Sequence, residues 1–420
     1  MPHNVCPFAT KEAEFLVERV RSRTIEWIAV ALLASCPALV GHTQSPALNA
    51  RQRAITLEEQ GKNSEAEVAW RGLLKLQPGN AEAYAHLGFL ESHQDHYARS
   101  IPLYRKALAL DPAMPGLRMN FGLVLFKAGH LRDALHIFEN LLKTERPSSV
   151  EAQRLTTLVG LCHYGLDEYA AAIPYLKQVT ANDPQNLSFR LILAHSCLWS
   201  KQYQCVLDVY HQILLLNAES AEADMLAGEA LDEMQDRAGA IEQFRSAVKA
   251  NPKEPNVHFG LGYLLWTESE YEEAAQEFQA ELANVPTNAQ ALAFLADSKI
   301  KLNDREAALP LLTKAAVMDS DLELPHVDLA ALYSDSGRSM GALRELKIAV
   351  KLKPNDVNVH WRMARLYQTM GRKDEAKREF EKTKSLTKAA DASVFSQLNN
   401  GREKAPSSPG AAGAHSNTQQ

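Results

Sequence analysis

A motif that returns every 34 residues constrains this chain more than any other feature of its sequence. From Gly88 the step leads to Gly122 and, after a four-residue insertion at 149–152, to Gly160. The motif position is Gly or Ala in all ten copies, at Ala54, Gly88, Gly122, Gly160, Ala194, Gly228, Gly262, Ala296, Ala330 and Ala364. Ten copies of one short unit indicate an array of similar elements, in which each unit packs on its neighbours.

Three further marks recur at fixed distances from this position. Twelve residues on, a second small site is Ala in eight of ten copies. Four residues later every copy has a large apolar residue: Trp70, Tyr104, Phe138, Leu176, Tyr210, Phe244, Phe278, Leu312, Leu346 and Phe380. Eight residues beyond that, six of the ten copies have Pro. The spacing predicts two helices of about fourteen residues in each unit.

Helix packing explains why these residue types stand at these places. Small residues on both helices permit a close approach, and the large apolar residue one turn later fills the space beside them. Proline ends the second helix because it lacks the N–H that a helix interior needs. Breakers or polar residues mark the turn between the two helices at Gly61, Asp95, Gly129, Asp167, Asn303, Gly337 and Gly371.

This pattern resembles the tetratricopeptide repeat family over residues 47–390. The resemblance implies an all-α fold, a superhelical α-solenoid of about ten helix-turn-helix repeats with a concave groove. The ten repeats are expected to start at 47, 81, 115, 153, 187, 221, 255, 289, 323 and 357. The insertion at 149–152 is expected to lengthen one loop. Residues 391–420 are expected to hold the remnant of an end helix and then a disordered tail rich in Gly, Ser, Pro and Asn.

In this family the first helix of each repeat lines the groove, which is therefore the candidate binding site. The residues mapped to it are Phe89, Phe126, Tyr164, Trp199, Glu229, Phe259, Tyr263, Trp266, Arg362 and Arg365. Aromatic side chains flanked by charge are typical binding anchors. The alternatives are that the aromatic residues pack between repeats and that the charged residues form an ordinary solvated face.

Composition excludes several function classes. Lys and Arg total 45 against 51 Asp and Glu, a formal charge of −6, which does not favour nucleic-acid binding. The repeats occupy nearly the whole chain, so no separate catalytic domain, cofactor or metal site is expected. His93 and His96 flank Asp95, but a solvated turn explains them better than a metal site. His258, His326 and His360 recur at one repeat position, where packing is the simpler explanation.

The N-terminal region, residues 1–45, is typical of an export signal. Arginines at 19, 21 and 23 precede a short apolar run from Trp27 to Leu33, and small residues follow. Residues 33–36, Leu-Ala-Ser-Cys, resemble a bacterial lipobox, in which Cys36 would carry the acyl chains. We therefore expect a bacterial protein exported to the periplasm or secreted. The alternatives are attachment to the membrane as a lipoprotein, and no export.

The five cysteines are too few for a disulfide scaffold. Cys162, Cys197 and Cys205 are expected to be small buried residues. In an oxidising compartment a bridge between Cys162 and Cys197 is the alternative.

These observations predict a non-enzymatic scaffold that holds a segment of a partner protein in a concave groove. One alternative is a membrane-tethered lipoprotein that assists assembly of the bacterial cell envelope. Another is an array that accompanies an enzyme, which the missing catalytic domain disfavours.

Overall fold

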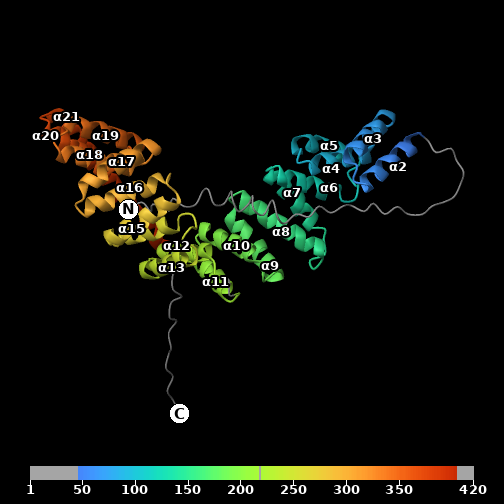
Figure 1. Cartoon of the computed structure of the whole chain (residues 1–420), viewed down its shortest axis with the longest axis horizontal. Helices are drawn as coiled ribbons and strands as arrows, with labels where there is room; N and C mark the ends of the chain where they lie inside the picture. The colour runs from blue at the N-terminus through green and yellow to red at the C-terminus, as the bar shows by residue number, and fades with distance from the viewer. Residues whose placement is uncertain (1–45, 217–218, 404–420) are drawn as a thin grey trace, which may run out of the picture. The chain divides into compact units, whose positions relative to one another are not determined.

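The computed structural model describes residues 46–216 and 219–403, and every regular element in them is an α-helix. Twenty helices, α2 to α21, form ten consecutive antiparallel hairpins (Figure 1). The predicted all-α solenoid of ten helical repeats is therefore confirmed. The expected export region at 1–45, with Cys36, lies outside the described residues.

The chain divides into two bodies, residues 1–251 and 252–420. The first body contains six hairpins, with helices α2 (Pro46–Glu59), α3 (Asn63–Leu76), α4 (Ala81–His93), α5 (Tyr97–Leu110), α6 (Leu117–Lys127), α7 (Leu131–Leu142), α8 (Val150–Gly165), α9 (Tyr169–Asn182), α10 (Leu187–Trp199), α11 (Tyr203–Leu214), α12 (Ala221–Glu233) and α13 (Arg237–Ala250). The second body contains four hairpins, with helices α14 (Val257–Thr267), α15 (Tyr271–Asn284), α16 (Ala289–Lys301), α17 (Arg305–Met318), α18 (Glu323–Asp335), α19 (Ser339–Leu352), α20 (Val357–Thr369) and α21 (Lys373–Glu403).

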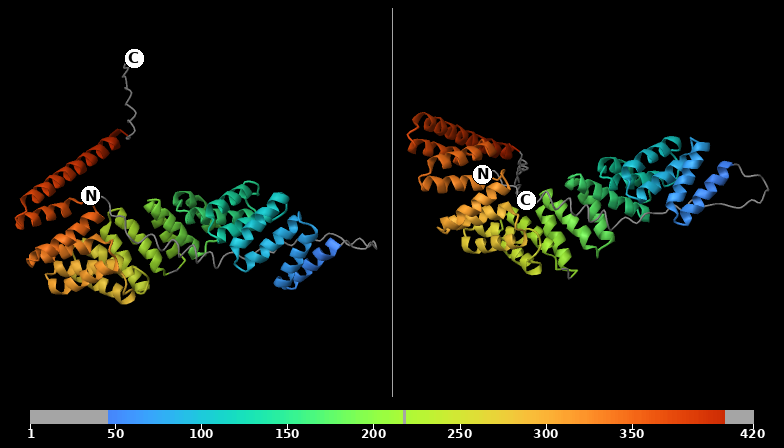
Figure 2. Two further views of the ribbon diagram at one scale, coloured as in Figure 1. Left: turned by 90° about the horizontal axis from the view of Figure 1, so that it is seen from above. Right: turned by 45° about the horizontal axis from the view of Figure 1, so that its top comes forward.

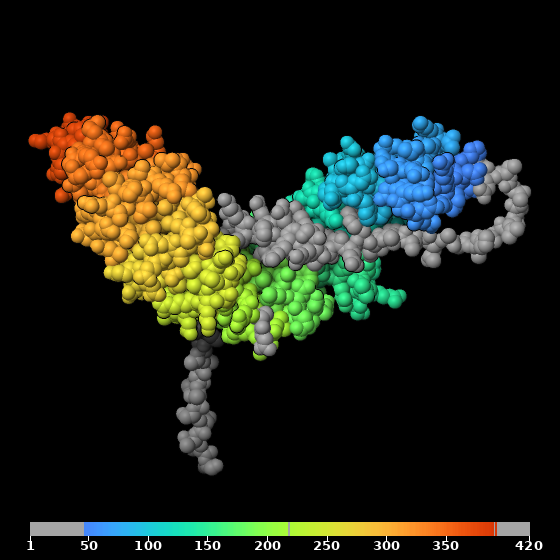
Figure 3. Space-filling view, in the orientation of Figure 1, coloured from blue at the N-terminus to red at the C-terminus, as the bar shows by residue number. Residues whose placement is uncertain are grey.

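Within each body, every hairpin packs on its sequence neighbours, so the colours in the space-filling view follow one another in chain order (Figure 3). The core accordingly runs along the array. In the first body one cluster of buried apolar side chains extends from Ile101 to Ala230. No single repeat provides enough apolar surface to close such a core alone.

The predicted close approach of paired helices occurs at the small residues. At Gly122 an added Cβ would lie 2.5 Å from Cε1 of Phe138, and at Gly228 it would lie 2.7 Å from Cδ2 of Phe244. Phe138 is fully buried and Phe244 almost so. The aromatic ring therefore occupies the space that a side chain at the Gly position would need.

Each hairpin turns through one residue in the left-handed region of backbone space. Seven of these residues are those predicted to mark the turns, and the other three are Lys201, Gln235 and Ser269, with φ of 59°, 66° and 67°. Left-handed backbone costs a residue with a Cβ about 1–2 kcal/mol. Packing of the repeats therefore imposes the turn even where the local sequence does not favour it.

Most of the four-residue insertion lies in a helix, although the connection between α7 and α8, residues 143–149, is also longer than the other connections between repeats, as expected from the sequence. Val150, Glu151 and Ala152 form the first turn of α8, which is 16 residues long. The Ser149 side chain caps this turn by accepting a hydrogen bond from the backbone N–H of Ala152 at 3.0 Å. A capping serine followed by residues that tolerate a helix extends the helix at its N-terminus.

A buried His–Glu pair links the two helices of three hairpins in the second body. Nδ1 of His258, His326 and His360 lies 2.6, 2.8 and 2.6 Å from a carboxylate oxygen of the glutamate 19 residues later. In the remaining hairpin the same two positions are Leu292 and Leu311, which pack together in an apolar cluster. These histidines therefore join the two helices of one hairpin, whereas the sequence interpretation was packing between hairpins.

The last helix is longer than expected. α21 continues to Glu403, and in Figure 2 it extends past the shorter helices of the preceding hairpins. The remnant of an end helix that was expected after residue 390 is therefore part of α21 as far as Glu403. Residues 404–420, the expected disordered tail, are outside the described part of the chain.

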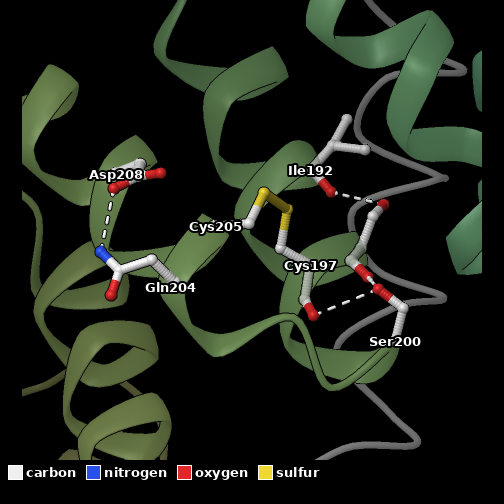
Figure 4. Close-up of a disulfide and its surroundings, with 7 residues drawn as sticks. Ile192, Cys197, Ser200, Gln204, Cys205 and Asp208 are labelled. Carbon is white, nitrogen blue, oxygen red and sulfur yellow. Dashed lines mark hydrogen bonds between the residues drawn. A yellow bond between two sulfur atoms is a disulfide. The ribbon is translucent and has the colours of Figure 1, made fainter. Parts of the chain in front are cut away.

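The disulfide expected as an alternative, Cys162–Cys197, is not the one that the structure contains. Cys197 is joined to Cys205 with a Cα–Cα distance of 5.7 Å, and Cys162 is buried and lies outside this bond. Figure 4 shows how the bond links the end of α10 to the first turn of α11, across the hairpin turn. Eight residues of separation around a tight turn bring these two helix ends within bonding distance.

Candidate functional site

Three of the residues predicted to line a groove are core residues. Phe126, Tyr164 and Phe259 are each 1% exposed. The ring of Tyr164 contacts the ring of Tyr169 at a centroid distance of 5.7 Å, and Phe259 contacts Phe278 and Phe294 at 5.7 and 5.8 Å. This burial favours the alternative that these three aromatic residues pack within the array, and their role in a binding surface stays a prediction.

The other predicted residues of the first body remain partly exposed. Phe89 on α4 lies edge-on to His93, with ring centroids 4.2 Å apart, and Trp199 at the end of α10 stacks on Tyr169 at 5.8 Å. Glu229 on α12 is also half-buried. These three side chains come from separate repeats.

The second body brings predicted residues together in one cluster. On α14, Tyr263 and Trp266 stack with ring centroids 6.2 Å apart. Phe294 on α16 stands edge-on to both rings, at 5.4 Å from Tyr263 and 5.1 Å from Trp266. All three side chains are partly exposed, so the cluster is both a packed unit and an accessible surface.

One carboxylate is bonded to this aromatic cluster, and a second lies near the first. The indole N–H of Trp266 donates a 2.7 Å hydrogen bond to Oδ2 of Asp297 on α16. Asp328 on the next first helix, α18, is 9% exposed, and its Oδ2 is buried without a hydrogen-bond partner. Burial, and after it the negative charge of Asp297, raise the pKa of Asp328 to about 7, against the opposing positive charges of Arg362 and Lys301.

The following first helix, α20, supplies an aromatic and two cations. Trp361 is 49% exposed, an unusual exposure for a tryptophan, and the guanidinium of Arg365 lies 5.6 Å from its ring centroid. Arg362, on the same helix, is exposed. We call α14, α16, α18 and α20, with these side chains, the inner face of the second body.

Sequence reasoning missed Phe294, Asp297 and Asp328, although the repeat register contains a signal for them. Phe294, Asp328 and Arg362 occupy the same position in consecutive first helices, the sixth residue of each repeat. Asp297 is the ninth residue of its repeat, between Tyr263 before it and Ala331 after it at the same position. At this one repeat position the residue type changes from aromatic to acidic to basic in three consecutive repeats. Packing between similar repeats does not explain such a change, which is therefore a signal of a functional surface.

The described residues contain no group of three or more His, Cys, Asp or Glu side chains able to hold a metal ion. Among the helices within 46–403, none is long and apolar enough to cross a membrane. What the inner face offers is an aromatic surface with buried carboxylates beside it, an arrangement suited to holding another molecule.

Models of the tetratricopeptide repeat match residues 51–115, 119–186, 225–289 and 357–389, together more than half of the chain. The chain therefore belongs to the tetratricopeptide repeat family.

Similar proteins are large and distant in sequence. Protein CTR9 homolog of Arabidopsis thaliana is 22% identical over 309 residues, which are 71% of this chain and 28% of that protein. BBSome complex member BBS4 of Bos taurus is 23% identical over 221 residues, 52% of this chain and 41% of that protein. The chain thus spans less than half the length of these two curated relatives.

Among solved structures, a tetratricopeptide repeat protein from Parabacteroides merdae is 16% identical, with a TM-score of 0.46 over 60% of this chain and 97% of that one. The crystal structure of the APC/C hetero-tetramer Cut9-Hcn1 is 13% identical, with a TM-score of 0.44 over 76% of this chain and 90% of that one.

Proposed function

We propose that this protein is a non-enzymatic interaction scaffold, and that the inner face of its second body holds a segment of a partner protein. The observation that carries the proposal is the cluster of Tyr263, Trp266 and Phe294, three large aromatic side chains in mutual contact and partly exposed. Aromatic residues of this kind dominate binding energy at protein interfaces because they bury a large area at low cost in side-chain entropy.

Two further points support a role in recognition. The helices that carry the cluster belong to hairpins whose cores are closed, so the surface is formed before a partner arrives and needs little ordering. One of the relatives is named as a member of a multiprotein complex, the BBSome. A role in assembling other proteins is consistent with that similarity.

The proposal is tested by removing the aromatic anchors one at a time. We expect Tyr263→Ala and Trp266→Ala to weaken partner capture from native cell extract, as quantified by mass spectrometry, with helicity by circular dichroism unchanged. The matched control is Gln279→Ala on the exposed side of α15, which should leave capture intact. If wild type and both aromatic variants capture the partner equally, the inner face is not the binding surface.

We also propose that the protein is exported. The Cys197–Cys205 disulfide supports this, because such bonds form and persist in oxidising compartments and are rare in the cytosol. In intact cells treated with a thiol-reactive reagent and then denatured, both cysteines should resist modification unless a reductant is added first. Prompt modification of both thiols without reductant, together with cytosolic fractionation, would contradict export.

A further inference from the structure

We propose that Asp297 and Asp328 are the receptor for a basic side chain, arginine or lysine, of the partner segment that the scaffold holds. This inference rests on the proposed function and adds to it the chemical class of the residue recognised. It starts from one atom, Oδ2 of Asp328, which is buried without a hydrogen-bond partner in the structure.

A buried carboxylate without a partner is costly. Desolvation penalises the ionised form, and an unsatisfied buried charged group costs more than a neutral one. An apolar residue in place of Asp328 would not carry this cost, and at another repeat position the array does hold apolar residues, Leu292 and Leu311, where other hairpins hold a His–Glu pair. An acid kept at such a cost, next to a second acid, is typical of a site that is completed by a ligand of opposite charge.

The cations of the protein itself do not complete the site. Arg362 on α20 and Lys301 at the end of α16 act on Asp328 only through space, and their influence is smaller than that of burial and of Asp297. Both side chains are exposed, and neither donates to the buried oxygen. Ala331 lies three residues after Asp328 on the same side of α18. Its side chain is only a methyl group, so it provides no hydrogen-bond donor to Asp328.

Asp297 joins Asp328 to the aromatic cluster. One of its oxygens accepts the indole N–H of Trp266, which uses only part of the acceptor capacity of a carboxylate. A basic side chain bound at Asp297 therefore lies close to the partly exposed ring of Trp266, which stacks on Tyr263. Contact of a cation with the face of an aromatic ring is favourable, most often for the planar guanidinium of arginine. The same geometry thus favours arginine over lysine.

The charge on Asp328 links this binding to pH. The groups that face it are Asp297, Arg362 and Lys301, and the two basic ones stay charged through the neutral range. Since the pKa of Asp328 is raised to about 7, the carboxyl is largely protonated below that pH and cannot attract a cation well. Affinity for a basic side chain should therefore rise as pH increases through 7.

The test uses three small probes with the full chain: acetyl-Ala-Arg-Ala-amide, acetyl-Ala-Lys-Ala-amide and acetyl-Ala-citrulline-Ala-amide. Citrulline has nearly the shape of arginine but no charge. Binding is followed by NMR of the Trp266 indole N–H, assigned by its loss in Trp266→Phe. We expect the arginine probe to shift this signal at lower concentration than the lysine probe, and the citrulline probe to leave it unchanged.

Three variants separate the site from general charge effects. Asp328→Asn and Asp297→Asn should each weaken the arginine probe at least about fivefold, and Asp328→Asn should also abolish the rise in affinity with pH. Asp335→Asn is the matched control, because Asp335 is an exposed aspartate on the same helix, paired with Arg305; it should have no effect.

Equal binding of the arginine and citrulline probes, no binding of either at about 20 mM, or unchanged binding to Asp328→Asn would overturn the inference. Partner capture distinguishes this failure from failure of the scaffold. Capture that is lost in Trp266→Ala but unchanged in Asp328→Asn and Asp297→Asn overturns the basic-residue receptor and leaves the scaffold standing. Capture that is unchanged in all of these variants removes both.

Discussion

Substitution of Gly122 by alanine tests the helix contact on which every repeat depends. The added Cβ would lie 2.5 Å from Cε1 of Phe138 and 3.1 Å from Cδ1 and Cζ of the same ring. Phe138 is fully buried, so its ring can move away only by displacing neighbouring side chains. Overpacking of this kind costs about 1–3 kcal/mol, and the gain in helix propensity returns up to about 1 kcal/mol. We expect a net loss of about 1–2 kcal/mol.

Gly160, at the same repeat position, is the matched control. Its added Cβ would meet Cβ of Tyr175 at 3.2 Å and Cδ2 of Leu176 at 3.4 Å, contacts that small movements relieve. Gly160→Ala should therefore be neutral or should stabilise by up to about 1 kcal/mol through helix propensity. Urea unfolding followed by far-ultraviolet circular dichroism would compare the two variants.

The clash can also be relieved from the other side. The smaller side chain of leucine stands opposite alanine in two hairpins, at Ala296 with Leu312 and at Ala330 with Leu346, although three other alanines of this position are paired with an aromatic residue. Phe138→Leu should thus cost stability alone but lessen the effect of Gly122→Ala, a coupling that a double-mutant cycle measures. Equal loss in Gly122→Ala and Gly160→Ala, with additive effects in the double variant, would refute the packing argument.

Three further predictions concern charge, backbone and the crosslink. The pKa of Asp328 is raised from 3.8 to about 7 in the folded chain, so the free energy of unfolding should fall as pH rises from about 4 to about 7. Asp328→Asn should lack this fall. In thermal unfolding it should be more stable than wild type by on the order of 2–4 kcal/mol above pH 7 and equally stable near pH 4. Gln235→Gly, at a residue with φ of 66°, should stabilise by about 0.5–1 kcal/mol in urea unfolding, and a loss would contradict the turn strain. Cys205→Ser, which removes the bond to Cys197, should cost about 2–3 kcal/mol, and unchanged unfolding would show that the crosslink does not restrain the unfolded chain.

The sequence predicts the fold because the same contact is repeated ten times. Each copy of the Gly/Ala position supports the same alignment of the repeats. The alignment therefore holds even in the first repeat, where Arg53 precedes Ala54 in place of the usual apolar residue. The turn at Gln235 could not be predicted locally, since glutamine does not favour left-handed backbone. The first turn of α8 could not be predicted because the inserted residues have no counterpart in the other repeats with which they could be aligned.

The candidate site is less predictable because the groove positions of the family do not determine exposure. Phe126 and Phe259 occupy such positions and yet are buried under neighbouring helices, whereas Tyr263 and Trp266 stay partly open. Which aromatic residue is covered depends on the size of side chains in the next repeat. Asp328 is not among the residues that the resemblance maps to the groove, and only the structure shows that its Oδ2 is buried without a hydrogen-bond partner.

Hydrogen exchange of the scaffold with its captured partner tests the central claim most directly. If the inner face of the second body holds the partner, binding should slow amide exchange in α14, α16 and α18, while the second helices α15, α17 and α19 change little. Protection confined to α15, α17 and α19, or to the first body alone, would contradict the assignment of recognition to the inner face.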